Sequence, residues 1–237
     1  MFLDALPHDE RAPLQSRLER VHLDHAQVLS EPNEPFSHAY FPIDSIVSIL
    51  SFANGGDAVE TGLVGREGVV GVPLFLGLEG DATRAICQVE GDAWRLRAGA
   101  FQEALARGGQ LPVLLGRYTQ ALLTMAMQSP VCNRVHPVEE RAARWLLMVH
   151  DRVPGDQLAL THEFIAQMLG VRRASVTVVM GQLQSAGLLT YHWGTVTIRD
   201  REGLEAAACE CYAKLAAQFD RLLGPTSLPT PTTNPDG

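Results

Sequence analysis

The sequence of 237 residues predicts an α+β protein with an N-terminal β-roll, one long helix and a C-terminal winged helix-turn-helix. Three observations predict this. Short β-prone runs separated by Gly and Asp turns fill residues 36–97. A long apolar stripe at helical spacing begins at Leu111. Two short amphipathic helices and a β-hairpin then follow between Leu160 and Ile198.

The composition is that of an ordinary globular protein, with 46% hydrophobic residues. No apolar run approaches the roughly 20 residues that span a bilayer, and Met1–Asp4 lacks the start of a signal peptide. The cysteines form no CxxC pair and no disulfide framework, which fits a reducing cytoplasm. We therefore expect a cytoplasmic protein with no membrane contact and no metal site. The four cysteines are Cys87, Cys132, Cys209 and Cys211.

The formal net charge of −8 is unevenly distributed. From Arg134 to Arg201 there are eight arginines and six acidic residues, whereas the remainder has eleven basic and twenty-one acidic residues. The C-terminal part is therefore slightly basic within an acidic chain. A local basic face is sufficient for phosphate binding, so the overall sign does not exclude a nucleic-acid partner.

The N-terminal 110 residues combine helix and strands. Residues 1–35 are predicted to be helical at first, from the spacing of Leu14, Leu18 and Val21, and then irregular. Short strands separated by turns suggest a small barrel or roll, and a helix at Ala100–Arg107 closes it. The predicted strands are Ile43–Phe52, Val59–Val64, Ala85–Val89 and Ala93–Leu96, and their turns include Asn54–Asp57, Gly80-Asp81 and Glu90–Asp92.

The long helix is predicted from Leu111 to about Gln128, and Pro130 is expected to end or kink it. Its stripe exceeds what either flanking domain would bury alone; the alternative is a helix packed wholly against its own β-roll. Pro137 suits the first turn of the next helix, so a hinge is expected near Arg134–Pro137. The stripe consists of Leu111, Leu114, Leu115, Tyr118, Leu122 and Met125.

The stretch from Leu160 to Ile198 predicts a helix-turn-helix and a wing. Thr161 suits an N-cap, and Gly170 suits the left-handed end of the first helix. The second helix has an inward stripe, with arginines and hydroxyls pointing outward near its start. A β-hairpin at 191–198 completes the winged helix. The inward stripe is Val176, Val179, Met180 and Leu183, and the outward residues are Arg172, Arg173, Ser175 and Thr177.

The C-terminal segment is predicted as one helix from Arg201 to Leu223. Cys209 and Cys211 would then face different directions as small buried residues. Residues 225–237 are rich in Pro and Thr and are expected to be disordered.

The helix-turn-helix resembles the DNA-binding domain of the Crp/Fnr superfamily. The resemblance lies in Thr161, Ala166, Leu169-Gly170-Val171, Arg173 and the Leu183–Leu188 exit. It implies a sensor-like β-roll at 1–110, a dimerisation helix and hinge at 111–136, a winged helix-turn-helix at 137–224 and a tail at 225–237.

The resemblance also assigns candidate DNA-binding residues. Arg173 takes the place of the family's main guanine-reading arginine, and Ser175 and Thr161 match hydroxyls that hold phosphates. Ala174 and Val178 depart from the pattern, so the preferred operator should differ from that of the cyclic-AMP-responsive members. The candidate residues are Thr161, His162, Arg172, Arg173, Ser175 and Thr177.

The family's nucleotide-binding members use a Gly-Glu pair and an arginine around the cyclic nucleotide. Gly71 and Arg84 match the glycine and the arginine as a candidate effector pocket, but Val72 stands in place of the glutamate and Pro73 follows it. An apolar residue cannot accept the ribose hydroxyl. We therefore expect no cyclic nucleotide and no cofactor, and an unidentified small effector stays open. The other interpretation is that Arg84 pairs with an acidic neighbour.

The resemblance implies a transcription regulator that binds double-stranded DNA as a homodimer, with RNA polymerase as a further partner. The alternative is a sensor or scaffold whose winged helix docks a protein. The sequence contains no Gly-rich phosphate loop, nucleophile elbow or paired catalytic carboxylates, so we expect no enzyme.

Overall fold

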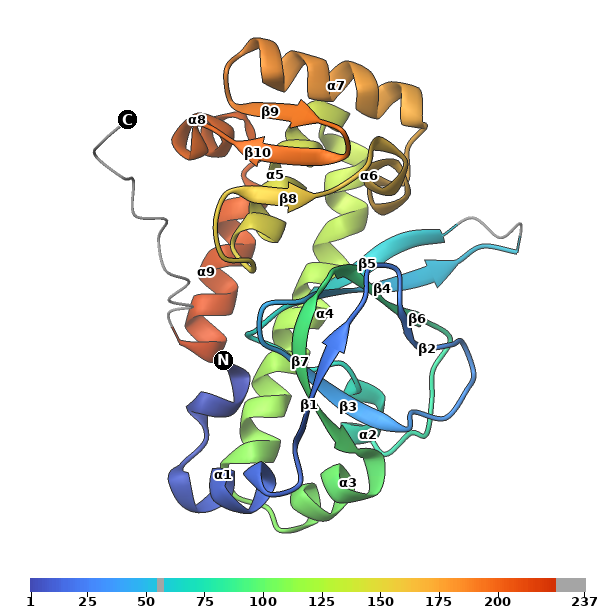
Figure 1. Cartoon of the computed structure of the whole chain (residues 1–237), viewed down its shortest axis with the longest axis vertical. Coiled ribbons are helices and arrows are strands. Elements are labelled where there is room, and N and C mark those ends of the chain that lie inside the picture. Colours follow the sequence, from blue (N-terminus) through green and yellow to red (C-terminus); the bar gives the residue numbers. More distant parts are fainter. Residues whose placement is uncertain (55–57, 225–237) are drawn as a thin grey trace.

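The computed structural model describes residues 1–54 and 58–224. Helix α4 (Gln110–Val135) runs through the molecule (Figure 1), with the β-roll on one side and helix α9 (Cys211–Leu223) packed along it. The C-terminal domain lies beyond the far end of α4. The predicted disordered tail at 225–237 and most of the turn at 54–57 lie outside the described residues. No helix among the described residues is long and apolar enough to cross a membrane.

Two antiparallel sheets form the β-roll, with strand orders β1-β7-β3 and β2-β6-β4-β5. Their inward side chains, such as Phe41, Ile46 and Leu63, are almost fully buried. The elements in chain order are a 3-10 helix (Phe2–Ala5), α1 (His8–Gln15), β1 (Glu19–Leu23), β2 (Val28–Ser30), β3 (His38–Pro42), β4 (Ile46–Phe52), β5 (Ala58–Val64), α2 (Val72–Phe75), β6 (Arg84–Val89), β7 (Gly91–Arg97) and α3 (Ala98–Ala106).

The strands β4 to β7 and helix α3 confirm the predictions for residues 43–107. The prediction for residues 1–35 was wrong after α1. Leu18 and Val21 are not on a helix, because Val21 belongs to β1 and pairs with Ala93. This strand buries only Leu23, so it lacks a clear apolar alternation. Strand β2 has three residues, too few to show any period.

Helix α4 does not end at Pro130 but continues to Val135. Pro130 is exposed, so the carbonyl that it leaves without a partner can turn to water. The predicted stripe faces the chain's own β-roll: Leu115 and Tyr118 are fully buried there, and Leu122 lies over Gly62 of β5. The prediction that this stripe forms the contact with a second copy was therefore wrong.

The C-terminal domain packs helices against a small sheet with the order β8-β10-β9. Its core includes Trp145, Leu158 and Ile165. The predicted single helix at 201–223 is two helices separated by Ala208–Glu210. The first is held to α5 by Arg201, whose Nη2 lies 2.6 Å from Asp151 Oδ1. The elements are α5 (Val138–His150), β8 (Gln157–Ala159), α6 (His162–Leu169), α7 (Arg173–Ser185), β9 (Leu189–His192), β10 (Thr195–Ile198), α8 (Arg201–Ala207) and α9.

Candidate nucleic-acid interface

Helices α6 and α7 meet through the turn that the sequence predicted. Thr161 caps α6, its hydroxyl accepting a hydrogen bond from the Phe164 N–H at 3.2 Å. Gly170 ends the helix in the left-handed conformation, with φ of 63°. The apolar stripe of α7 is buried as predicted. The Thr161 oxygen accepts this bond, and its O–H remains available to donate a hydrogen bond to a phosphate.

The start of α7 is an exposed cationic surface. Arg172 is the N-cap residue and Arg173 is the first helical residue, and no acidic residue lies in the first turn. Within the described chain Arg172 has no ion pair. Arg173 Nε is 3.9 Å from Glu163 Oε2, but both side chains are at least 70% exposed. Such an exposed pair is worth less than about 1 kcal/mol, so it separates easily when a stronger anion arrives.

Further along α7 the exposed face becomes small and apolar. Ala174 and Val178 are exposed, and Gly181 has open space around its Cα. Ser175, in contrast, is partly buried at the third helical position. The first two turns of α7 therefore present a pair of arginines followed by short side chains, and the exposed Gln182 comes one turn later. A surface of this shape can approach the floor of a groove closely.

The predicted wing is present as the β9–β10 hairpin, next to α7 in Figure 1. Its tip is Trp193-Gly194, with φ of 47° and 83°. Positive φ at both turn residues is typical of a type I′ hairpin. The Trp193 side chain is fully exposed. The sequence pattern did not single out this tryptophan as a candidate, although an aromatic residue in a predicted hairpin turn was a usable signal.

His162 of α6 contacts both α7 and the wing. Its ring stacks on Tyr191 of the wing, with centroids 4.1 Å apart, and its Nδ1 lies 3.1 Å from Thr177 Oγ1 on α7. The Thr177 hydroxyl donates to the Arg173 carbonyl, so the imidazole donates to the hydroxyl. Burial, and then the charge of Arg173, lower the pKa of His162. His162 and Thr177 therefore hold α6, α7 and the wing together.

The candidate effector residues lie apart from this surface. Gly71, with φ of 118°, precedes the short helix α2. Arg84 Nε lies 2.8 Å from Glu31 Oε2, and its guanidinium lies over the Phe52 ring at 4.9 Å. The predicted acidic neighbour of Arg84 is confirmed as Glu31. This arginine is held by protein groups, and an incoming phosphate would have to displace the Glu31 carboxylate.

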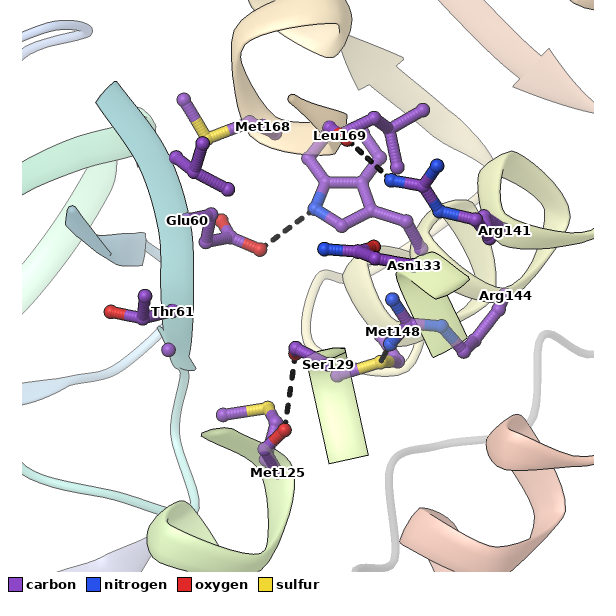
Figure 2. Close-up of a pocket in the computed structure, with 13 residues that line it drawn as sticks. Glu60, Thr61, Met125, Ser129, Asn133, Arg141, Arg144, Met148, Met168 and Leu169 are labelled. Atoms are coloured by element: carbon purple, nitrogen blue, oxygen red, sulfur yellow. Dashed lines mark hydrogen bonds between the residues drawn. The ribbon is translucent and has the colours of Figure 1, made fainter. Parts of the chain in front are cut away.

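The β-roll contacts the C-terminal domain around a small cavity of about 20 Å³ (Figure 2). Glu60 of β5 accepts a hydrogen bond from Trp145 Nε1 of α5 at 2.8 Å. Its second oxygen accepts from Ser48 Oγ at 2.7 Å. Burial raises the pKa of Glu60 to about 7, against the lowering effect of these two bonds. The same junction contains the buried ion pair Arg152–Glu67, at 2.7 Å.

Sequence comparison identifies the C-terminal domain. Residues 140–207 match the family model of the Crp-like helix-turn-helix domain. No curated protein matches the chain.

Solved structures match over most of the chain. FixK2 from Bradyrhizobium japonicum matches with 18% identity and a TM-score of 0.67, over 81% of this chain and 98% of that one. A Crp/Fnr-family transcriptional regulator from Thermus thermophilus matches with 22% identity and a TM-score of 0.63, over 80% and 98%. The c-di-GMP-responsive global regulator CLP of Xanthomonas campestris has 18% identity and a TM-score of 0.62, over 81% and 99%. The chain therefore has the fold of Crp/Fnr-type transcription regulators and carries their Crp-like helix-turn-helix domain.

Proposed function

We propose that the protein is a transcription regulator that binds a palindromic DNA operator as a homodimer, with α7 in the major groove. The observation that carries this proposal is the exposed start of α7. It presents Arg172 and Arg173 without an acidic residue in the first turn. The positive end of the helix dipole adds to the attraction for a phosphate.

The side chains of α7 suggest which contacts would read the bases. The planar guanidinium of Arg173 suits the O6 and N7 acceptors of guanine. Val178 is 62% exposed on α7, where the cyclic-AMP-responsive relatives have a second base-reading arginine. An exposed valine favours contact with a thymine methyl group over a hydrogen bond. Trp193 at the wing tip is placed to contact the backbone beside the groove.

A second copy would pack on the outer face of α4. Four apolar residues at intervals of four are at least half exposed there: Leu123, Met127, Val131 and Val135. Among the described residues nothing covers this row, so its burial against the same row of a second copy would form an isologous contact. In the helix-turn-helix arrangement the two half-sites lie about 34 Å apart.

The proposal does not include a cyclic nucleotide. Val72 lacks the acceptor for a ribose hydroxyl, and Arg84 is engaged by Glu31. RNA polymerase as a partner, and a location in the cytoplasm, are expectations that follow from the same proposal.

The test measures binding to a fluorescent duplex of random sequence at several salt concentrations. Wild type should bind with an affinity that falls steeply as salt rises. The variant Arg172→Ala/Arg173→Ala should lower the slope of log affinity against log salt by about one unit, because Arg172 is the one of the two that is expected to hold a phosphate. Arg107→Ala removes an exposed arginine at the end of α3, far from α7, and should leave the slope unchanged. Wild-type protein that does not bind any duplex would instead favour a protein partner on the winged helix.

A further inference from the structure

Three of the four cysteines meet at one point. Cys132 lies near the end of α4, Cys211 is the first residue of α9, and Cys209 lies in the break before it. All three are buried, and they form a cluster separate from the main core. Their sulfur atoms all lie within 4.8 Å of one another. The sequence did not indicate this cluster, because the spacing is not CxxC and Cys132 is 77 residues from Cys209.

The surroundings are polar, unlike those of cysteines that only fill space. Gln128 Nε2 donates to Cys211 Sγ at 3.2 Å. Arg141, buried on α5, lies close enough to Cys132 and Cys209 for its charge to interact with both thiols. Its Nε finds no hydrogen-bond partner within the described chain. A donor and a cation beside three sulfurs would stabilise thiolates, and thiolates are the form that binds a metal.

The sulfur separation fits a metal site. Cys132 Sγ and Cys209 Sγ are 3.6 Å apart. Two sulfurs on a tetrahedral zinc ion, with Zn–S bonds of about 2.3 Å, lie about 3.8 Å from each other. A disulfide would need them at about 2.05 Å. The observed separation is thus close to one edge of a ligand tetrahedron.

A fourth ligand lies next to the cluster. His136 follows Cys132 by one turn of α4, and a ring nitrogen of His136 lies within 4.8 Å of the Cys211 sulfur and a Glu210 oxygen. Its Nδ1 is 3.1 Å from Glu140 Oε2. A histidine that ligates a metal through one nitrogen commonly donates from the other to a carboxylate, which fixes the ring. Glu140 supplies that carboxylate for Nδ1. Nε2 lies 3.4 Å from Glu210 Oε2, so binding of a metal at Nε2 would displace the Glu210 carboxylate.

We propose that Cys132, Cys209 and Cys211 bind a zinc ion, with His136 as the fourth ligand. Zinc binds the thiolate form of each cysteine, so binding releases the thiol protons. Three thiolates and a neutral imidazole on Zn²⁺ give a site of net charge −1 near the cation of Arg141. No electron is transferred.

The proposed site would cross-link the two elements on either side of the hinge near Arg134–Pro137. It joins the last turns of α4 to the break between α8 and α9, so it fixes the C-terminal domain relative to α4. Arg141 Nη2 also donates to the carbonyl of Leu169 at the end of α6. The metal would therefore be connected to the helix-turn-helix through one arginine. This inference does not depend on DNA binding.

The test uses full-length protein, reduced with a phosphine and freed of metal, then dialysed against micromolar Zn²⁺. We expect one zinc per chain by elemental analysis, with proton release on titration. Titration with Co²⁺ should give the visible bands of a tetrahedral ion and the sulfur-to-cobalt charge-transfer bands of three thiolates. Cys132→Ser, Cys209→Ser and Cys211→Ser should each weaken binding by at least about tenfold, and His136→Gln should weaken it and change the cobalt spectrum.

Cys87→Ala is the matched control, because Cys87 is the one other cysteine and is buried in the β-roll. It should still bind one zinc, and zinc should raise its melting temperature as it does for wild type. The idea is overturned if the reduced wild type takes up no zinc or gives no thiolate–cobalt bands. It is also overturned if the folded serine variants bind zinc as tightly as wild type. If the reduced protein takes up no metal and the oxidised protein forms a Cys132–Cys209 disulfide, the cluster is a redox pair and the zinc proposal is wrong.

Discussion

In the proposed function, Arg173 is the residue of α7 that would read a guanine. Its guanidinium is exposed at the first helical position and is held only by a weak contact with Glu163. A bidentate contact with guanine is worth about 1–3 kcal/mol of discrimination. We therefore expect Arg173→Ala to lose most of the preference for a selected operator while keeping most of the affinity for random duplex. Anisotropy with both duplexes measures this.

Arg172→Ala is the comparison for that experiment. The N-cap position makes a phosphate contact easier than a base contact, so this variant should weaken both duplexes by similar factors and lower the salt slope by about one unit. If Arg173→Ala also weakens both duplexes equally, Arg173 holds a phosphate and does not read a base.

Glu60 should make the stability of the protein depend on pH. Its pKa is about 7 in the folded protein, above the ordinary value of 4.5. For an acid raised in this way, the folded state keeps its proton while the unfolded state loses it, so stability falls as pH rises from about 4.5 to 7. At pH 8 the cost is about 2–3 kcal/mol, because each pKa unit corresponds to about 1.4 kcal/mol and the residue keeps some exposure to solvent.

The variant Glu60→Gln tests this, because glutamine keeps an acceptor for Trp145 and has no proton to lose. Chemical denaturation should show that the free energy of unfolding of the variant, relative to that of wild type, rises by about this amount between pH 5 and pH 8. A difference between the two proteins that stays constant over this range would contradict the raised pKa.

At the scale of elements, α4 has two apolar faces, one buried and one exposed. The inner face packs on the β-roll, and the outer face holds Leu123, Met127, Val131 and Val135. If the outer face is the dimer contact, Leu123→Glu buries a charge there and costs several kcal/mol. Sedimentation should then show monomers at micromolar concentration.

The chain offers a close control for this experiment. Leu78 is 52% exposed and Leu123 is 50% exposed, but Leu78 lies in the segment after α2 and is not part of the outer face of α4. Leu78→Glu should therefore remain a dimer. If Leu123→Glu sediments as a dimer, the outer face of α4 is not the dimer contact.

The sequence predicted the existence of α4 but not which face meets a second copy. The periodicity of apolar residues shows an apolar face, and it cannot show what covers that face. Leu122 was assigned to the dimer contact, whereas it lies over Gly62 of the β-roll. Leu123, one position later, points about 100° away and is exposed. Strand β1 was missed for the related reason that only its Leu23 is buried.

At the scale of the whole molecule, some features of the structure depend on residues close together in the sequence, and others depend on contacts between distant residues. The caps, the turn and the arginines of α6 and α7 are local, and the sequence predicted them. The contact of Glu60 with Trp145 spans 85 positions, and the cysteine cluster depends on a break between α8 and α9 that no Gly or Pro marks. Local pattern does not contain such contacts, because they arise only when the two domains pack together.

The account depends most on the claim that a dimer reads two half-sites in double-stranded DNA. Selection of bound fragments from a pool of random duplexes, followed by sequencing, tests this claim most directly. We predict an enriched inverted repeat, with half-site centres one helical turn apart, about 34 Å, and with a guanine in each half-site. A pool that shows no enriched motif after repeated rounds, or one in which the enriched motif is single and unrepeated, would contradict it.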